Sequence, residues 1–341
     1  MNMRPQTLDD YIGQNHIKDF VNITVTSAKQ RGEPLSHTIL TGPSGVGKTT
    51  LALIIANMIG ANCRIVNAAG VEGVESVKKV FGEINSFDVI FIDEIHRLPV
   101  RIEELLYHPM EDGILEVVQE VEQYDPLEWG RYRTKLLCDR TSLITPPKPP
   151  KPRKLGTETV TLKLPPFTLI GATTNEGSLT KPLRDRFGNT INLTLYSDEE
   201  MALIAKQKAD MLNINITDSA TKNLARRCRS TARVCVNHIG SCRDVAQYHS
   251  RTTIDDDIVE QTMLMLGIDQ EGLTHKDLAY LEALSVSNRP QGVNALASRL
   301  GESRNTLEEI IEPFLISKGF VVRTSRGRTI TEEGKEYLWK K

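Results

Sequence analysis

The chain has 341 residues, with 42 lysines and arginines against 44 aspartates and glutamates and a formal net charge of −2. This length suffices for two or three domains with a buried core, and the charge excludes a polycation, so any surface for nucleic acid must be a local patch. Five cysteines without a Cys-x-x-Cys pair, no secretory signal at the N-terminus and no apolar run long enough to span a bilayer predict a cytoplasmic protein of a reducing compartment with no membrane partner.

A helix is predicted from about Ile17 to Arg31, where apolar residues recur at spacings of three and four, and a short buried strand precedes Gly42. The next residues, GPSGVGKT (42–49), match the pattern Gly-x4-Gly-Lys-[Ser/Thr], and a second helix begins at Thr50. Glycines there turn backbone N–H groups inward, so that these donors and the positive end of the helix cradle a polyphosphate. The residues expected to bind the nucleotide here are Gly42, Gly45, Val46, Gly47, Lys48, Thr49 and Thr50.

Two residues of this loop have individual roles. Lys48 is placed to reach the β- and γ-phosphates, and the Thr49 hydroxyl is a ligand for Mg²⁺. A glycine-rich turn that binds nothing is the alternative, which the strand before the loop and the helix after it disfavour.

Two carboxylates follow the next buried strand. After a predicted strand at Arg64–Asn67 and a helix at Val74–Asn85, four consecutive apolar residues (89–92) indicate a central parallel strand that ends at Asp93 and Glu94. Ligands of open parallel sheets bind at the carboxyl ends of the strands. We therefore expect Asp93 to hold Mg²⁺ through water and Glu94 to orient and deprotonate the attacking water. The alternative is that these carboxylates only cap the next helix.

Two further motifs carry weaker signals. The apolar strand FTLIGATT (167–174) ends in hydroxyls that suit a γ-phosphate, although paired threonines are also common at ordinary strand ends. The segment PLRDRFG (182–188) places two arginines around an aspartate, which on spacing alone indicates a solvated basic turn.

Taken in order, GPSGVGKTT, FIDEIHRL, LPPFTLIGATT and PLRDRFG resemble the motifs of AAA+ ATPases, and in detail those of RuvB-type Holliday junction branch-migration motors. The resemblance runs from Arg4 to about Leu338. It implies that Thr174 is the sensor-1 residue and that Arg186 is an arginine finger acting on ATP bound by the neighbouring subunit. It also implies that Arg4, Tyr11 and Ile12 belong to the segment that contacts the adenine.

Predicted helices at Asp198–Leu212, Thr217–Arg229 and Ala232 to about Arg251 resemble the AAA+ helical lid. The family carries its sensor-2 arginine in a Gly-Thr-Pro-Arg motif, which here reads Ser-Thr-Ala-Arg and ends at Arg233. Three residues on one face of the third helix have ligand chemistry and allow a metal site, with core packing as the favoured alternative. They are Cys235, His238 and Cys242.

The C-terminal part resembles a winged-helix domain. Its predicted helices are Asp277–Ser285, Val293–Leu300 and Arg304–Phe314, the last in the recognition position, and a hairpin wing covers 320–330. The wing region has no acidic residue among its cations, so it can neutralise phosphates without reading sequence; a solvated hairpin or a protein-docking module is the alternative. The cations expected to contact DNA are Arg323, Arg326 and Arg328, with Lys318 nearby.

The sequence departs from the family between 111 and 166, where RuvB-type motors have a short β-hairpin that grips RuvA, their junction-binding partner. Here the segment is longer, and its returning strand is predicted at Thr159–Leu164. Between Arg131 and Lys154 it holds eight lysines and arginines, with Asp139 as its acid, and a Pro-rich run that favours an extended or disordered chain. An inert spacer, a second DNA contact and a replacement partner grip are the alternatives, so RuvA as partner stays open.

The sequence thus predicts an α/β P-loop AAA+ domain at 1–196, a parallel sheet flanked by helices, followed by an all-α lid at 197–268 and a winged-helix domain at 269–341. The resemblance implies an ATP-driven DNA helicase, assembled as a hexameric ring on duplex DNA, that migrates Holliday junctions in recombination and repair. A clamp-loader-like ATPase is disfavoured because a winged helix replaces the collar domain. A nucleotide-gated DNA-binding adaptor is disfavoured by the intact Glu94 and Arg186.

Overall fold

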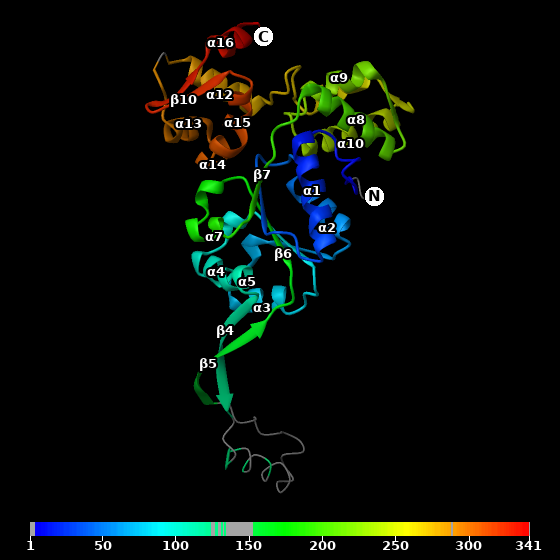
Figure 1. The fold of residues 1–341 in the computed structure, drawn as a ribbon. Coiled ribbons are helices and arrows are strands. Elements are labelled where there is room, and N and C mark those ends of the chain that lie inside the picture. The colour runs from blue at the N-terminus through cyan, green and yellow to red at the C-terminus, as the bar shows by residue number, and fades with distance from the viewer. Residues whose placement is uncertain are drawn as a thin grey trace, which may run out of the picture. The chain divides into compact units, whose positions relative to one another are not determined.

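The computed structural model describes residues 4–123, 127–128, 131, 133, 153–287 and 289–340 (Figure 1). The chain forms two compact units. We call residues 16–42 and 48–192 the sheet unit, and residues 1–15, 43–47 and 193–341 the helical unit. The predicted domain boundaries at 196 and 268 stay predictions.

The sheet unit is built on a five-stranded sheet in the order β2-β3-β6-β1-β7, in which every pairing is parallel (Figure 1). This confirms the predicted α/β architecture. The three central strands are apolar and buried almost throughout, as expected where helices cover both faces. The strands are β1 (Thr38–Thr41), β2 (Cys63–Asn67), β3 (Val89–Asp93), β6 (Thr168–Thr173) and β7 (Asn189–Asn192).

The helices of this unit pack their apolar faces on the sheet, and one cluster joins Ile39 and Ile90 of the strands to Val77 and Phe81. They are α1 (Asn15–Arg31), α2 (Lys48–Ile59), α3 (Val74–Phe81), α4 (Val100–Leu105), α5 (Tyr107–Glu111) and α7 (Lys181–Asp185), with short turns η1 (Ala68–Gly70), η2 (Ile95–Arg97) and η4 (Glu176–Ser178).

One helix of the sheet unit is shorter than predicted. The sequence predicts Val74–Asn85, whereas α3 ends at Phe81. The carboxylate of Asp88 accepts the backbone N–H of Asn85 at 2.8 Å and so begins the turn into β3. The acid at the start of a strand therefore competes with the helix for this backbone donor.

A long hairpin leaves the sheet unit and returns to it. Strand β4 (Ile114–Gln123) pairs in antiparallel fashion with β5 (Arg153–Lys163), with a register shift after Val121. The hairpin was expected, but its returning strand begins six residues before the predicted Thr159, because the pairing continues to Gln123 and Arg153. The Pro-rich run (146–152) and most of the basic segment 131–154 lie outside the described residues.

The helical unit contains the lid, in which α8, α9 and α11 begin at residues whose side chains cap the helix; Ser197 and Glu200 form a capping box at the first of them. The lid elements are α8 (Asp198–Met211), α9 (Asp218–Arg226), α10 (Ala232–Tyr248) and α11 (Asp256–Met265), with a small parallel pair of β8 (Asn215–Ile216) and β9 (Thr253–Ile254). Helix α9 stops before the predicted Arg229, since Arg229 and Ser230 have left-handed backbones with φ of +52° and +53°.

The winged helix closes the chain around its own core, which includes Tyr280, Leu296, Leu307 and Leu315. Its elements are α12 (His275–Ser285), α13 (Val293–Leu300), α14 (Arg304–Thr306), η5 (Leu307–Ile311), α15 (Glu312–Ser317), β10 (Val321–Thr324), β11 (Gly327–Ile330) and α16 (Glu332–Trp339).

The helix in the recognition position continues to Ser317, past the predicted Phe314. It contains a π-helical turn, η5, immediately before Glu312-Pro313. Because proline lacks the backbone N–H that an α-helix needs, a wider turn at this point lets the helix pass Pro313.

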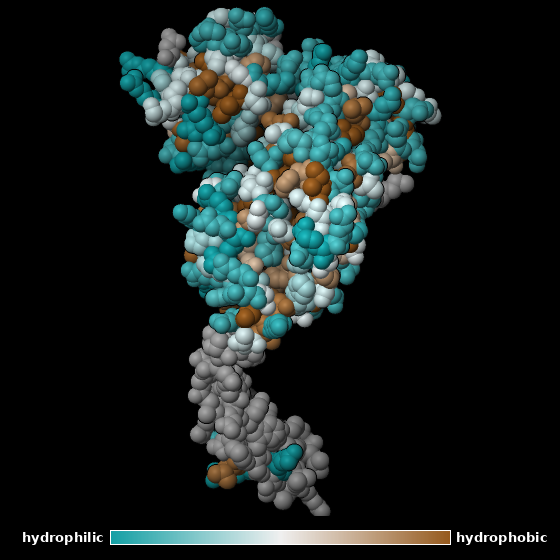
Figure 2. All heavy atoms as spheres, viewed as in Figure 1, coloured by the Kyte–Doolittle hydropathy of each residue, from teal (hydrophilic) through white to brown (hydrophobic). Residues whose placement is uncertain are grey.

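None of the described helices is long and apolar enough to cross a membrane. The face seen in Figure 2 is largely hydrophilic, and its apolar residues lie in small groups.

Candidate functional site

The carboxyl ends of the central strands bring the predicted motifs of the sheet unit together. Because β6 lies between β1 and β3, Thr41 pairs with Thr173, and Ile92, just before Asp93, pairs with Gly171. Lys48 starts α2, is buried, and donates from Nζ to the carbonyl of Gly42 at 2.7 Å. The α2 N–H donors and the lysine thus belong to the same edge of the sheet as Asp93 and Thr173.

Glu94 has a strained backbone, with φ of +52° and ψ of +45°, which non-glycine residues rarely adopt. Its backbone N–H donates to Oδ1 of Asp93 at 3.1 Å. Although Glu94 stands at the start of η2, its side chain makes no capping hydrogen bond there, so the capping alternative is wrong for this residue. The left-handed turn instead presents the carboxylate at the end of β3.

Two neighbours hold the Glu94 carboxylate. Thr174 donates from Oγ1 to Oε2 at 3.4 Å, and Nδ1 of His96 lies 3.3 Å from the same oxygen. The same imidazole nitrogen is 3.0 Å from Oγ1 of Thr173, which also accepts the N–H of Asn175. Sequence reasoning missed His96, although its position two residues after Glu94 was a usable signal.

Arg186 is packed against its own unit rather than solvated. Its guanidinium donates from Nη1 to the carbonyl of Pro182 at 2.8 Å and from Nη2 to Glu111 at 3.0 Å, and it lies 4.2 Å from the centre of the Tyr107 ring. The side chain is 20 % exposed, so the reading as a solvated basic turn is wrong. Among the described residues its Nε–H finds no hydrogen-bond partner.

The Tyr107 ring is itself fixed from behind. Its hydroxyl is 3.1 Å from Oγ1 of Thr180, which donates to the buried carboxylate of Glu103. This chain of contacts orients the surface on which the Arg186 guanidinium lies.

In the helical unit, the middle of the phosphate-binding loop is held by two tyrosines. Tyr11 and Tyr196 both donate their hydroxyl protons to the carbonyl of Val46, at 3.2 and 2.8 Å. Burial raises the pKa of both phenols, so they remain protonated donors. A Cβ on Gly47 would lie 2.8 Å from the Tyr11 hydroxyl, which explains the need for glycine there. Sequence reasoning missed Tyr196, which is 150 residues away from Val46 along the chain.

The remaining predicted nucleotide ligands differ in exposure. Arg233 is exposed; its backbone N–H donates to the carbonyl of Gly45 at 3.3 Å, and its Nη1 donates to Ser44 at 3.4 Å. Arg4 is exposed and Ile12 is half-buried. Thr49 and Thr50, in the first turn of α2, are also half-buried.

The wing arginines meet carboxylates that the sequence did not place beside them. Arg323 and Arg328 both pair with Glu312, at 2.5 and 2.9 Å, and Arg328 also pairs with Glu308 at 2.7 Å. Glu312 is fully buried and accepts the hydroxyl of Tyr280 at 2.8 Å. Arg326, at the tip of the wing, is exposed. The charge of the wing is therefore partly neutralised from the helix below it.

Comparison with known proteins covers almost the whole chain. The family models described as Holliday junction DNA helicase RuvB P-loop domain, RuvB AAA lid domain and RuvB C-terminal winged helix domain match residues 3–124 with 153–193, 196–269 and 270–339. The Holliday junction branch migration complex subunit RuvB of Oenococcus oeni is 39% identical over 340 residues, which is 99% of this chain and 91% of the relative. The chain belongs to the RuvB family.

A second relative and a solved structure agree with this. RuvB of Streptococcus agalactiae serotype Ia is 37% identical over 338 residues, covering 98% of this chain and 92% of that protein. The structure titled Thermotoga maritima RuvB Holliday junction branch migration motor is 34% identical, with a TM-score of 0.80 and coverage of 99% of this chain and 98% of that one.

The RuvB P-loop model matches on both sides of residues 125–152 and not within them. The enlarged hairpin content inferred from the sequence is therefore outside what the family model describes. It is bounded by the paired ends of β4 and β5 at Gln123 and Arg153.

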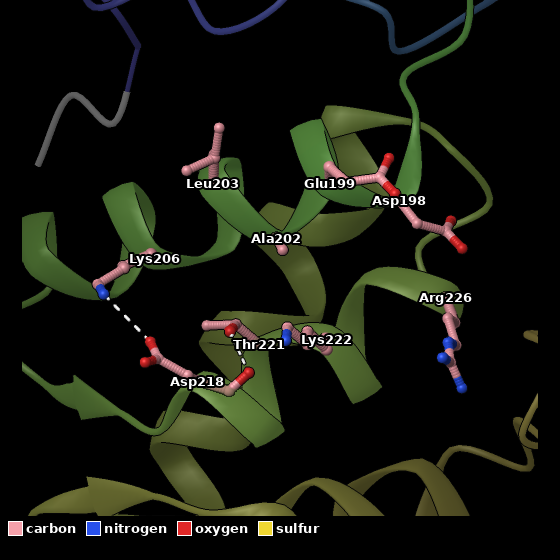
Figure 3. A pocket seen from close by; sticks show the side chains of 9 residues that line it. All are labelled: Asp198, Glu199, Ala202, Leu203, Lys206, Asp218, Thr221, Lys222 and Arg226. Atoms are coloured by element: carbon pink, nitrogen blue, oxygen red, sulfur yellow. Dashed lines mark hydrogen bonds and ion pairs between the residues drawn. The ribbon is translucent and has the colours of Figure 1, made fainter.

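The RuvB lid holds no metal-binding cluster in the part of the chain that is described. Cys235, His238 and Cys242 are buried in α10, and Cys228 lies 3.8 Å from the imidazole, as expected for a packing face. A pocket of about 520 Å³ opens between α8 and α9, and Figure 3 shows Asp198, Leu203 and Arg226 on its walls. It includes none of the residues predicted to bind ATP.

Proposed function

We infer that this chain is the ATP-driven motor subunit for branch migration of Holliday junctions. Its membership of the RuvB family supports this, because the named relatives match along nearly their whole length. The observation that carries the chemistry is the Glu94 carboxylate, held by Thr174 and His96 at the edge of the sheet where α2 begins. Hydrolysis of ATP by this family drives branch migration.

We propose the following roles in ATP hydrolysis. The loop 42–49 and Lys48 bind the phosphates, and Glu94 takes a proton from the attacking water while Thr174 and His96 keep its carboxylate aimed. Arg186 stabilises the transition state on ATP bound by a neighbouring subunit, which requires a ring, here proposed to be a hexamer. The remaining nucleotide contacts are assigned to Arg4, Tyr11, Ile12, Thr50 and Arg233.

The donor set suits Mg²⁺, which prefers hydroxyl and carboxylate oxygens and keeps several waters. Thr49 offers a hydroxyl at the first turn of α2, and Asp93 offers a carboxylate at the end of β3. When bound, Mg²⁺ would neutralise charge on the phosphates. We propose both residues as its holders, Asp93 through water.

For DNA, we propose contact of the winged helix with the phosphates of duplex arms, led by Arg326 because Arg323 and Arg328 already pair with Glu312. A RuvA-like protein is the proposed partner at the junction and the cytoplasm the proposed location. Helicase activity is also proposed. Movement of the motor along duplex DNA would separate paired strands at the crossing point of the junction and pair them with new partners.

The test measures ATP turnover by the chain alone, with linear duplex and with four-way-junction DNA, each with and without RuvA. We expect junction DNA to raise turnover, and a mobile junction to be resolved into duplexes only with ATP. Lys48→Ala is the control, since it removes phosphate binding. Absence of turnover in a folded ring would favour the nucleotide-gated adaptor, and turnover without strand exchange would refute the motor.

A further inference from the structure

Five consecutive residues of the lid, 229–233, follow α9, which ends at Arg226, and lead into the first turn of α10; we call them the linking segment. Arg229 and Ser230 both have left-handed backbones, with φ of +52° and +53°. Such backbones persist in non-glycine residues only where surrounding contacts hold them. Contacts hold this segment at both of its ends.

The C-terminal end of the linking segment contacts the phosphate-binding loop. Arg233 donates its backbone N–H to Gly45 and its guanidinium to Ser44. The approach is close, since a Cβ on Gly45 would lie 3.2 Å from Cβ of Arg233 and 3.4 Å from Cβ of Thr231. A movement of Ser44 or Gly45 would therefore displace the segment.

The middle of the segment has a second connection to the same loop. The carbonyl of Ser230 accepts the backbone N–H of Tyr196 at 3.1 Å, and the hydroxyl of Tyr196 donates to Val46 at 2.8 Å. Two routes thus join the linking segment to the loop, through Gly45 and through Val46.

The N-terminal end contacts the winged helix through Arg229. Its guanidinium pairs with the buried carboxylate of Asp277 in α12, donates to the carbonyl of Gly272 at 3.3 Å, and lies 4.5 Å from the centre of the Phe314 ring in α15. Asp277 also accepts the N–H and hydroxyl of Thr274 at 2.7 and 2.6 Å, which caps α12. A planar guanidinium can make such contacts on several sides at once, whereas a lysine ammonium cannot.

We propose that Arg229 is a positioning residue that couples the nucleotide at the phosphate-binding loop to the DNA affinity of the winged helix. The inference rests on the proposed function, because it takes ATP as the ligand of the loop and DNA as the ligand of the wing. Within the linking segment, three residues separate Arg229, whose guanidinium contacts α12 and α15, from Arg233, which contacts the phosphate-binding loop. Binding energy from one ligand is thereby transmitted to the orientation of the domain that holds the other.

Coupling of this kind is measurable and reciprocal. If nucleotide changes DNA affinity by some factor, DNA must change nucleotide affinity by the same factor. An arginine that only stabilises the junction of lid and winged helix would alter the unfolding midpoint but leave this factor unchanged.

The experiment compares the full-length wild type with Arg229→Lys, which keeps the charge and loses the planar fork, and Phe314→Leu, which removes the ring beneath it. Arg251→Lys is the matched control, since Arg251 is a lid arginine paired with Asp255 and Asp257 away from the segment. For each, the Kd for a synthetic four-way junction is measured with ATPγS and without nucleotide, and the Kd for ATPγS with and without that DNA. Urea midpoints and basal ATP turnover are measured alongside.

We expect a wild-type coupling factor of at least about fivefold, the low end for allosteric proteins, that falls toward one in Arg229→Lys and Phe314→Leu and is retained in Arg251→Lys. Basal turnover should be unchanged in all three variants. A wild-type factor of one, or an unchanged factor in both folded test variants, overturns the proposal. Failure of the proposed function is distinguishable, because the wild type would then lack turnover or junction binding altogether.

Discussion

At the scale of single residues, the site depends on how Glu94 is presented. Its left-handed backbone ends β3 and places the carboxylate within reach of Thr174 and His96. Such strain is typical of residues whose position serves chemistry rather than stability. The Thr174 hydroxyl and the His96 imidazole both contact the same carboxylate oxygen, Oε2.

We predict that Glu94→Gln binds ATP normally but turns it over about 10²–10⁴-fold more slowly, because the water loses its base. Lys48 and Thr49 are untouched in this variant, so nucleotide binding should persist. ATP binding by calorimetry and steady-state turnover separate the two effects. Normal turnover by Glu94→Gln would refute the assignment of the base.

The residues that the sequence singles out are those in contiguous motifs, such as Lys48 and Asp93, because the motif pattern depends on local spacing; their roles stay predictions. Tyr196 and His96 were missed for different reasons. Tyr196 meets Val46 only through tertiary folding, whereas His96 stands two residues after Glu94, a signal that was present in the sequence and was not used. Glu312 was missed likewise, since its pairing with the wing arginines arises between separate elements.

At the scale of elements, the wing and the helix beneath it form one charged assembly. Glu312 is buried and pairs with Arg323 and Arg328, whereas Arg326 stands exposed at the tip. Two of the three wing arginines, Arg323 and Arg328, therefore contribute to the stability of the domain, and the third, Arg326, is available to contact a DNA phosphate. Sequence alone could not separate these roles, because the acids come from another element.

We predict that Arg326→Gln flattens the plot of log DNA affinity against log salt by up to ~0.9, as expected for one lost phosphate contact on duplex. Arg328→Gln should instead lower the free energy of unfolding by about 1.5–3 kcal/mol, since it removes a charged hydrogen bond from buried Glu312. Salt titrations of DNA binding and urea unfolding test both. An unchanged salt slope in Arg326→Gln would place the DNA contact elsewhere.

We predict that the stability of the lid depends on pH, because helix α10 contains the buried His238. Burial, with the charges of Arg229 and Arg227, lowers the pKa of His238 to about 4 from its ordinary 6.5. As the pH falls below 6.5, this histidine binds a proton in the unfolded chain, but in the folded chain it stays neutral until about pH 4. The free energy of unfolding therefore decreases between these two pH values, by roughly 3 kcal/mol at most.

The free energy of unfolding in urea, measured from about pH 7.5 to about pH 4 so that the ordinary pKa of histidine is included, tests this pH dependence in wild type and His238→Phe. The variant should lose this part of the pH dependence. The exposed His249→Phe serves as the control and should retain it. Equal pH dependence in wild type and His238→Phe would contradict the prediction.

At the scale of the whole molecule, catalysis is proposed to need more than one chain. Arg186 contacts Tyr107 and Glu111 of its own sheet unit. An arginine finger contributes roughly 10³–10⁵ in rate, so subunits lacking it should bind ATP and fail to hydrolyse it.

We predict that mixing Arg186→Ala with Lys48→Ala subunits restores part of the activity that each lacks alone. Some interfaces in mixed rings then pair an intact phosphate-binding loop with an intact finger. Turnover measured across mixing ratios, with ring formation followed by light scattering, tests this. Mixed rings that form without any rescue would count against action between subunits.

The α/β fold class was predictable from the apolar strands and the phosphate-binding motif between strand and helix, whereas the lid and the winged helix were expected from the resemblance to the family. The lengths of β5 and of the recognition helix were not, since pairing and a π-helical turn extend them beyond what local propensity indicates. The content of residues 124–152 has no motif that assigns a function.

We predict that replacing residues 124–152 by a short Gly-containing turn leaves basal ATP turnover intact and changes the free energy of unfolding little, because each doubling of loop length costs only about 0.6 kcal/mol. Junction binding and RuvA-dependent unwinding are then measured on the same variant. A shallower salt slope would indicate a DNA contact, and a defect seen only with RuvA a partner grip. Loss of basal turnover in a folded ring would contradict the prediction.

The pairing of Gln123 with Arg153 has a consequence for how such a protein changes over generations. The chain departs from the hairpin and re-enters it at adjacent positions, so genetic material can be gained or lost at this point without altering the path of either strand. Selection can then act on the inserted sequence separately from the ATPase domain to which it is attached. A lineage that acquired a new partner protein at the junction could replace residues 124–152 alone, and the ATPase domain would be inherited unchanged.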